Sequence, residues 1–232
     1  MRALVADNPQ GVVPNVVTTL GELARNALSW AWRAIARGKV MARLRQRDSA
    51  AAKDEAKELS GGLQQRLGMT PDMMKVMAAS PALLGGYLGF SMALADGRLD
   101  AKFREQIALV VAHANNSDYC FFRHAAIAMR MGMSESEIGE CLESRSNDAK
   151  TDAGLKFVGQ LVLFRGRVNN GAVERVRAAG YSDAEIVEVV ANVALDMFTN
   201  YLDQVAGAAV DLPKVSAMLK SNPAEKSLRA FP

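Results

Sequence analysis

Apolar residues recur at intervals of three and four along most of the chain, and no segment shows the strict apolar–polar alternation of a β-strand. The longest such segment runs from about Asp183 to Ala209, where apolar residues surround a single polar stripe. The stripe has helical spacing and comprises Glu185, Glu188, Asn192, Asp196, Asn200 and Asp203. Since so wide an apolar surface must be covered, we expect this helix to pack against its own domain or a neighbouring subunit. The pattern predicts an all-α fold.

Capping signals predict where the helices begin. Thr70-Pro71-Asp72 and Ser80-Pro81 each place a hydroxyl residue before a proline that suits the first turn of a helix. After a break at Gly97, Asp100 can cap a helix that runs to about Ala114. These signals predict three consecutive helix starts.

Further along the chain, Asn115-Asn116-Ser117 predicts a turn, so the next helix starts near Asp118. Segments 132–138 and 180–186 each contain a glycine stop followed by a Ser-x-x-Glu capping box. Their similarity indicates two related helical hairpins, although such boxes are common enough to recur by coincidence.

Charge and punctuation divide the chain into three parts. We interpret residues 1–60 as a basic amphipathic N-terminal arm, residues 61–213 as the helical domain and residues 214–232 as a short polar tail. The first 48 residues carry eight basic and three acidic side chains, so they hold a charge of +5 in a chain whose net charge is +3. The basic excess therefore belongs to the arm.

The arm also contains Trp30 and Trp32, and a basic amphipathic helix with tryptophans could lie on an anionic membrane surface. Packing against the domain or a partner subunit is an equal use of such a helix. An upstream translation start that adds residues before Met41 or Met69 is a further alternative. Packing or such an added segment is favoured over the membrane.

The composition excludes several classes of protein. The chain has 232 residues, of which 50% are hydrophobic, 23% charged and 6% aromatic. That balance excludes wholesale disorder, collagen-like repeats and a disulfide scaffold, and the small net charge argues against a nucleic-acid partner. The absence of a long apolar run and of a secretory signal, with only two cysteines, leads us to expect a cytoplasmic protein.

Few side chains can carry chemistry, because the chain has two cysteines and two histidines. If Ser117 is the N-cap, Cys120 is the third helical residue, where backbone N–H groups and the helix dipole favour a thiolate. His124 lies one turn later on the same face. The turn before this helix could bring Glu105, from the start of the preceding apolar helix, to the same place.

Glu105, Cys120 and His124 therefore form a candidate thiol-activating set. An ionised Glu105 beside Cys120 would raise the pKa of the thiol. The set works best if Glu105 pairs with His124 or acts as a base through water. Cys120 could instead be a small buried hydrophobe, and His113 and Cys141 are interpreted as packing residues. Zinc is not expected, because one cysteine and two histidines do not complete a closed site.

The segment from Arg104-Glu105 to His124, with the capped helix start that follows it, resembles the alkyl hydroperoxidase D and carboxymuconolactone decarboxylase superfamily. The matching pattern is Arg-Glu, an apolar helix, then N-x-C-x-Y-C-x-x-x-H and G-x-S-x-x-E-I, and the resemblance covers most of residues 65–213. It implies a multihelical alkyl hydroperoxidase D-like fold that assembles as trimers, hexamers or larger rings, without a cofactor.

The resemblance also implies roles for single residues. Cys120 matches the peroxide-attacking second cysteine of the family's C-x-x-C pair, and Glu105 and His124 match its proton relay, with Tyr119 as a supporting neighbour. Ser117 stands where the family has its first cysteine. Cys120 therefore cannot form the usual C-x-x-C disulfide, and a sulfenate would be resolved by Cys141, an external thiol or a second subunit.

Three functions follow as hypotheses. The first is a single-cysteine, peroxiredoxin-type antioxidant peroxidase that takes a small peroxide and an external thiol reductant. The second is a lyase or decarboxylase that acts on a small carboxylated lactone or keto acid through Glu105 and His124. The third is a catalytically idle oligomeric or membrane-surface binding protein.

Overall fold

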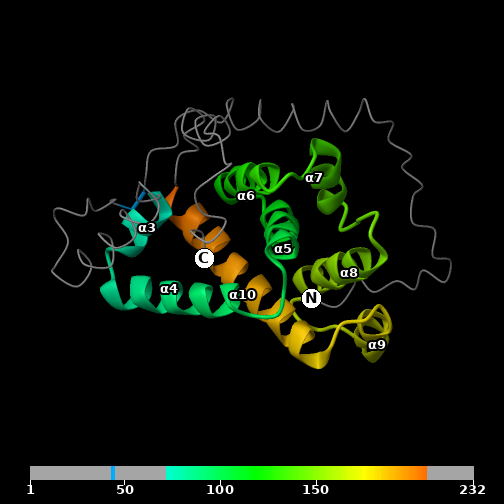
Figure 1. Ribbon diagram of the computed structural model, residues 1–232. Helices are drawn as coiled ribbons and strands as arrows, with labels where there is room; N and C mark the ends of the chain where they lie inside the picture. Colours follow the sequence, from blue (N-terminus) through cyan, green and yellow to red (C-terminus); the bar gives the residue numbers. More distant parts are fainter. Residues whose placement is uncertain (1–42, 45–71, 208–232) are drawn as a thin grey trace, which may run out of the picture. The chain divides into compact units, whose positions relative to one another are not determined.

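The structure, a computed structural model, describes residues 43–44 and 72–207, and all regular secondary structure in these ranges is helical (Figure 1). This confirms the predicted all-α fold. The helices are α3 (Asp72–Met77), α4 (Pro81–Ala95), α5 (Ala101–Ala114), α6 (Asp118–Arg130), α7 (Glu135–Leu142), α8 (Ala149–Leu163), α9 (Asn170–Ala178) and α10 (Asp183–Ala206). Apart from residues 43–44, the proposed arm (1–60) lies outside the described residues, as does the proposed tail (214–232), and both stay predictions.

Where the structure describes the capping residues, the helices begin as predicted, whereas Thr70 and Pro71 lie outside the described residues. Ser80 accepts a hydrogen bond from the Leu83 amide at the start of α4, and Asp100 accepts one from the Phe103 amide at the start of α5. Both predicted capping boxes form, at Ser134 before α7 and at Ser182 before α10.

The glycine stops that precede these two boxes are also confirmed. Gly132 and Gly180 have φ values of +87° and +96°, a conformation that side chains with a Cβ rarely adopt. Each glycine therefore reverses the chain between a helix end and the next helix start. The α10 helix ends at Ala206, slightly before the expected Ala209.

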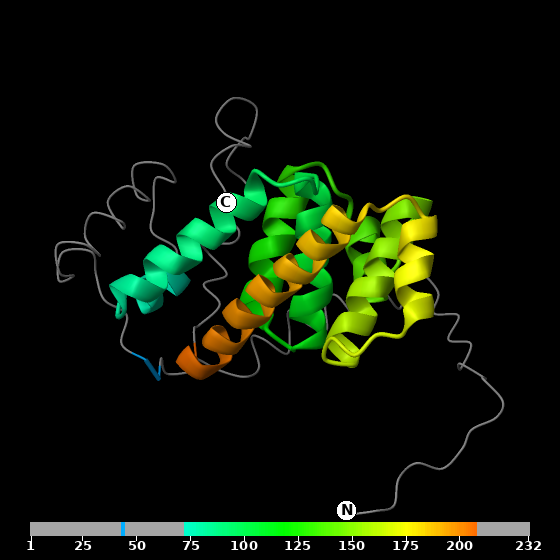
Figure 2. The same cartoon turned by 90° about the horizontal axis from the view of Figure 1, so that it is seen from below.

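Helix α5 is the centre of the larger hydrophobic core. It packs against α6, α7, α8 and α10, and the two views show these helices around it (Figures 1 and 2). Its side chains Ile107, Leu109 and Val111 are fully buried. A helix surrounded in this way gives each neighbouring helix a fixed surface to pack on.

A second, smaller core lies between α3, α4 and the carboxyl half of α10. It consists of methionines and leucines of α3 and α4, with Tyr119, Phe198 and Leu202 packed against them. Phe121 is close in sequence to Tyr119, and Met197 is next to Phe198. Both Phe121 and Met197 nevertheless pack on the larger core. The helices α6 and α10 therefore run along the boundary between the two cores.

The polar stripe of α10 faces the interior, and part of its apolar surface faces outward. Asn192, Asn200 and Asp203 are buried. In contrast, Val187 is 67% exposed and Tyr201 is 55% exposed on the other side of the helix. The described chain thus covers the polar side of α10 and leaves an apolar stripe open. None of the described helices is long and apolar enough to cross a membrane.

We expect Leu109→Ala to lower the free energy of unfolding by about 2–5 kcal/mol, because it removes a fully buried side chain from the central helix and leaves a cavity. Urea denaturation measures the change. Leu163→Ala is the matched control, since Leu163 is 72% exposed at the end of α8 and its truncation should change stability by less than about 0.5 kcal/mol. Equal effects of the two substitutions would contradict the central role of α5.

Candidate active site

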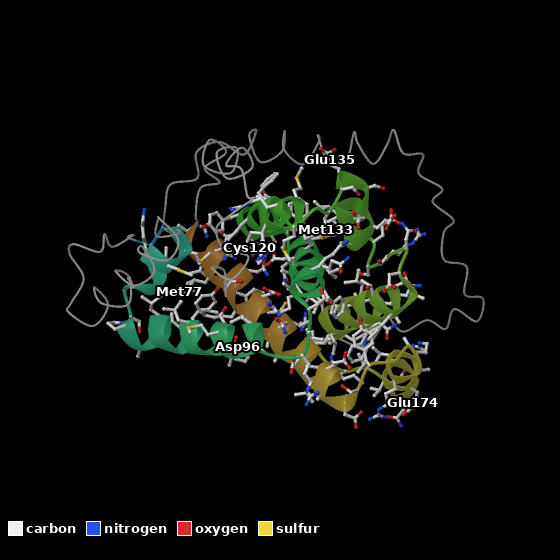
Figure 3. All side chains as sticks on the ribbon, in the orientation of Figure 1. Met77, Asp96, Cys120, Met133, Glu135 and Glu174 are labelled. Carbon is white, nitrogen blue, oxygen red and sulfur yellow. The ribbon has the colours of Figure 1, made fainter. Side chains whose placement is uncertain are left out.

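Cys120 lies in the first turn of α6, as its third residue, on the side of the helix that faces α10 (Figure 3). The position agrees with the sequence prediction, but the charge state does not. The side chain is 4% exposed, and this burial raises the pKa of the thiol to about 12, although the neighbouring Ser117 side chain acts in the lowering direction. Desolvation thus outweighs the helix terminus, and the resting form is a thiol.

Glu105 and His124 form the pair that the sequence suggested. Nδ1 of His124 lies 2.8 Å from Oε2 of Glu105, and both side chains are largely buried between α5 and α6. On the other side of the ring, Nη1 of Arg123 lies 3.3 Å from Nε2 of His124. Because a carboxylate accepts hydrogen bonds, Nδ1–H of His124 is the donor in the contact with Glu105.

Arg123 is a partly buried cation among these groups. The neighbours that act on its charge are Tyr87, Tyr119, Glu105 and Cys120, which keep its pKa raised despite the opposing effect of burial. Tyr87, in turn, has its pKa raised by burial and lowered by Arg123. A fixed positive charge beside Cys120 favours negative charge that develops on the sulfur or on a bound substrate.

Two carboxylates of α10 complete the site. Burial raises the pKa of Asp196 to about 7; His124 and Arg123 oppose the rise, while Glu105 adds to it. Burial also raises the pKa of Asp203 to about 6. Both charges act on Cys120 and raise its pKa. Asp196 and Asp203 therefore belong to the same cluster as Cys120.

Ser117 takes the N-cap position of α6, but its side chain does not cap the helix. The hydroxyl instead donates a hydrogen bond of 2.7 Å to Oδ2 of Asp203, and both residues are buried. The residue that replaces the family's first cysteine is therefore tied to α10.

Sequence reasoning missed Arg123, Asp196 and Asp203 as site residues. Arg123 gave no signal, because an arginine one position before the histidine is unremarkable in a helix. The two aspartates did give one, since both belong to the polar stripe of an otherwise apolar helix. A stripe of this kind can face either solvent or a polar interior, and only packing distinguishes the two.

Cys141 and His113 lie apart from this cluster. Cys141 is fully buried in α7, and the groups that act on its thiol are Gln106, Glu140, Glu137 and Lys102. None of them acts on Cys120, so the two thiols occupy different surroundings. His113 is partly buried near the end of α5, and burial lowers its pKa.

A separate polar hollow of about 350 Å³ opens between α5, α7 and α8. Four of its nine lining residues are acidic: Asp100, Glu137, Glu140 and Asp148. Lys102 pairs with Glu137 at 2.8 Å. Among the described residues, no three histidine, cysteine or acidic side chains are grouped closely enough to hold a metal ion.

Residues 81–159 match the sequence model of the carboxymuconolactone decarboxylase family. This range contains Glu105, Ser117, Cys120 and His124. No curated protein matches the chain significantly.

Solved structures share the fold at low sequence identity. An alkylhydroperoxidase AhpD core, a peroxidase-related protein from Ralstonia eutropha JMP134, has a TM-score of 0.67 and 21% identity, with 80% of this chain and 98% of that chain covered. A peroxidase-related protein from Silicibacter sp. TM1040 has a TM-score of 0.64 and 21% identity over 73% and 90%. The debrominase Bmp8 has a TM-score of 0.60 and 18% identity over 72% and 90%. These likenesses establish the alkyl hydroperoxidase D-like fold.

We expect Asp196→Asn to stabilise the protein at about pH 8 and not at about pH 4. The pKa of Asp196 in the folded protein is raised to about 7, above the ordinary value near 4. The buried charge therefore destabilises the fold progressively as the pH rises from about 4 to 7. Asparagine avoids that charge, and the gain at pH 8 is on the order of 1–3 kcal/mol.

Urea denaturation at the two pH values measures this gain. Asp148→Asn is the control, because hydrogen bonds with Thr151 lower the pKa of that exposed carboxylate and its loss brings no gain at pH 8. If Asp196→Asn is no more stable than the wild type at pH 8, neighbouring groups offset the cost of burying the Asp196 charge, and the prediction is wrong.

Proposed function

Because residues 81–159 match the carboxymuconolactone decarboxylase family, we propose that this chain is a thiol-dependent peroxidase with antioxidant, peroxiredoxin-type activity. Cys120 is its single reactive cysteine, and its substrate is a small peroxide. The observation that supports this most is that Cys120 shares one cluster with the hydrogen-bonded Glu105–His124 pair and the Arg123 cation.

The first half of the reaction uses these groups together. The Glu105–His124 pair takes the proton of the Cys120 thiol as the sulfur attacks one oxygen of the peroxide. The O–O bond breaks, and the pair passes that proton to the departing alkoxide. Arg123 stabilises the negative charge while it moves from sulfur to oxygen. Cys120 is left as a sulfenic acid.

The second half of the reaction needs thiols from outside the chain. Ser117 cannot form a disulfide, and Cys141 is buried among different neighbours. One external thiol converts the sulfenic acid to a mixed disulfide and releases water, and a second thiol restores the Cys120 thiol and leaves as a disulfide. The net reaction consumes one peroxide and two thiols.

A lyase or decarboxylase that acts on a small carboxylated lactone or keto acid is the second candidate. It is supported by the Glu105–His124 pair, which forms without any contribution from Cys120, and by the raised pKa of the thiol. In this reaction the pair moves a proton on the substrate, and Arg123 binds the carboxylate.

We expect Cys120→Ser to abolish thiol-dependent consumption of an alkyl hydroperoxide, and Glu105→Gln and His124→Asn to slow it by about 100-fold or more, the usual worth of a positioned acid–base group. Peroxide loss with a monothiol reductant measures the rate. Cys141→Ser is the matched control and should keep the wild-type rate. If wild type and Cys120→Ser are equally slow, the peroxidase proposal fails. Turnover of a carboxylated lactone that survives Cys120→Ser would favour the lyase.

We also propose that the protein is a homo-oligomer, a trimer or hexamer, in which a second copy covers the outer face of α10. Val187, Val190, Tyr201 and Val205 leave an exposed stripe at helical spacing along this helix. The neighbouring α4 has no charged residue and exposes Phe90 and Met92. Contiguous apolar surface of this kind indicates a protein contact.

We expect the double substitution Val187→Glu and Tyr201→Glu to lower the molar mass measured by light scattering after size-exclusion chromatography, because two charges would be desolvated in each contact. Leu163→Glu is the control, since Leu163 is equally exposed on α8 and its substitution should leave the mass unchanged. A wild type with the mass of one chain would contradict the oligomer.

A further inference from the structure

The turn between α5 and α6 is held against α10 by three side-chain hydrogen bonds. Nδ2 of Asn115 donates to Sδ of Met197 at 2.9 Å, and Nε2 of Gln204 donates to the main-chain oxygen of Asn115. Two residues further along the turn, the Ser117 hydroxyl donates to Oδ2 of Asp203 at 2.7 Å. All three partners on α10 lie in the carboxyl half of that helix, so one segment of α10 holds the whole turn.

Cys120 follows this turn directly. The Ser117 carbonyl accepts the first hydrogen bond of α6, from the Phe121 amide at 2.9 Å, and Cys120 is the third residue of that helix. The position of the turn therefore sets the position of the first turn of α6. Since Cys120 faces α10 and is 4% exposed (Figure 3), the contacts that hold the turn also hold the sulfur in its buried place.

Two of the three hydrogen bonds are individually weak. The thioether of Met197 is a weak acceptor, and Gln204 is an exposed side chain whose hydrogen bond competes with water. Between the held residues, Asn116 has a φ of +53°, a left-handed conformation that asparagine adopts more readily than most residues. Exposed segments held by a few such bonds open locally at a much smaller free energy than global unfolding requires.

We propose that Met197, Asp203 and Gln204 are positioning residues for Cys120, because they hold the α5–α6 turn and thereby keep the sulfur buried against α10. Reagents from solution then reach the sulfur when the turn leaves α10, and the strength of the three contacts sets how often this happens. The exposed Gln204 thus controls the reactivity of a buried thiol through the turn. The proposal rests on Cys120 as the nucleophile of the proposed peroxidase.

The environment of Cys120 makes this role measurable. Burial raises the pKa of the thiol to about 12, Asp203 and Asp196 of α10 act in the same direction, and Arg123 of α6 opposes them. Tyr87 of α4 also lies within electrostatic reach of the sulfur. When the turn leaves α10, the sulfur regains contact with water and its pKa falls. The thiolate, which is the form that reacts with alkylating reagents, then becomes both more abundant and more accessible.

Gln204→Glu is the main variant, since it keeps the shape of an exposed side chain but loses the N–H donor to Asn115. We expect Cys120 in this variant to react with iodoacetamide about three- to tenfold faster at pH 8, the change that follows from the loss of one hydrogen bond. The new carboxylate by itself would slow the reaction, because a negative charge near Cys120 disfavours the thiolate. A faster reaction therefore reports the release of the turn. Gln204→Lys retains a donor and should keep the wild-type rate.

A second variant tests the turn itself. Asn115→Asp removes the donor to Met197 and should also speed the reaction of Cys120, and it changes nothing on the outer face of α10. Asn147→Asp is the matched control. The Asn147 amide donates to Oε1 of Glu140 at 2.8 Å, away from the turn, so the same exchange of amide for carboxylate should leave the rate unchanged.

Cys141 serves as an internal control in every sample. It is fully buried in α7, so its alkylation reports global unfolding of the domain. Mass spectrometry quantifies the modified Cys120 and Cys141 peptides from one reaction. We expect Gln204→Glu to speed the modification of Cys120 and to leave that of Cys141 unchanged, a difference that a general loss of stability would not produce.

Three results would overturn the positioning role: equal Cys120 rates in the wild type and Gln204→Glu, equal acceleration of Cys120 and Cys141, or a Gln204→Lys variant as fast as Gln204→Glu. Alkylation needs no peroxide, so this proposal and the peroxidase fail separately. The expected rates in a protein that does not consume peroxide would contradict only the peroxidase. Unchanged rates in a protein with Cys120-dependent peroxide consumption would contradict only the positioning role.

Discussion

The burial of polar side chains between α6 and α10 is the constraint on which the site depends. Asn200 and Asp203 are buried on the inner side of α10, whose outer side is apolar, an inversion of the usual arrangement for a helix at the surface of a monomer. Desolvation raises the pKa values of Asp196, Asp203 and Cys120. The burial that costs stability thus brings the pKa values of both carboxyl groups close to neutral pH.

Local signals along the chain predicted the fold well, because helix starts are set by side chains within one turn of the cap. Ser80, Asp100 and the boxes at Ser134 and Ser182 all cap as expected. The spacing of Cys120 and His124, together with the resemblance, also identified Glu105, and the structure pairs it with His124 at 2.8 Å. These features depend on contacts within one helix or between helices joined by one short turn.

The parts that could not be predicted depend on contacts between distant segments. Helix periodicity shows that α10 has a polar and an apolar side, but not which side faces α6, so Asp196 and Asp203 were not assigned to the site. The pKa of Cys120 shows the same limit. Position at a helix start favours a thiolate, whereas the burial imposed by α4 and α10 does not, and burial has the larger effect.

Ser117 stands where the family has its first cysteine. The difference removes a disulfide partner for Cys120 and also changes the hydrogen bonds that the side chain can make. A cysteine at the N-cap would offer a sulfur that can trap a Cys120 sulfenate, but a thiol is a weak hydrogen-bond donor. A hydroxyl cannot form a disulfide, yet it can accept one hydrogen bond while it donates another, and here it reaches Asp203 at 2.7 Å. In the proposed peroxidase, Cys120 would therefore depend on an outside thiol for its reduction.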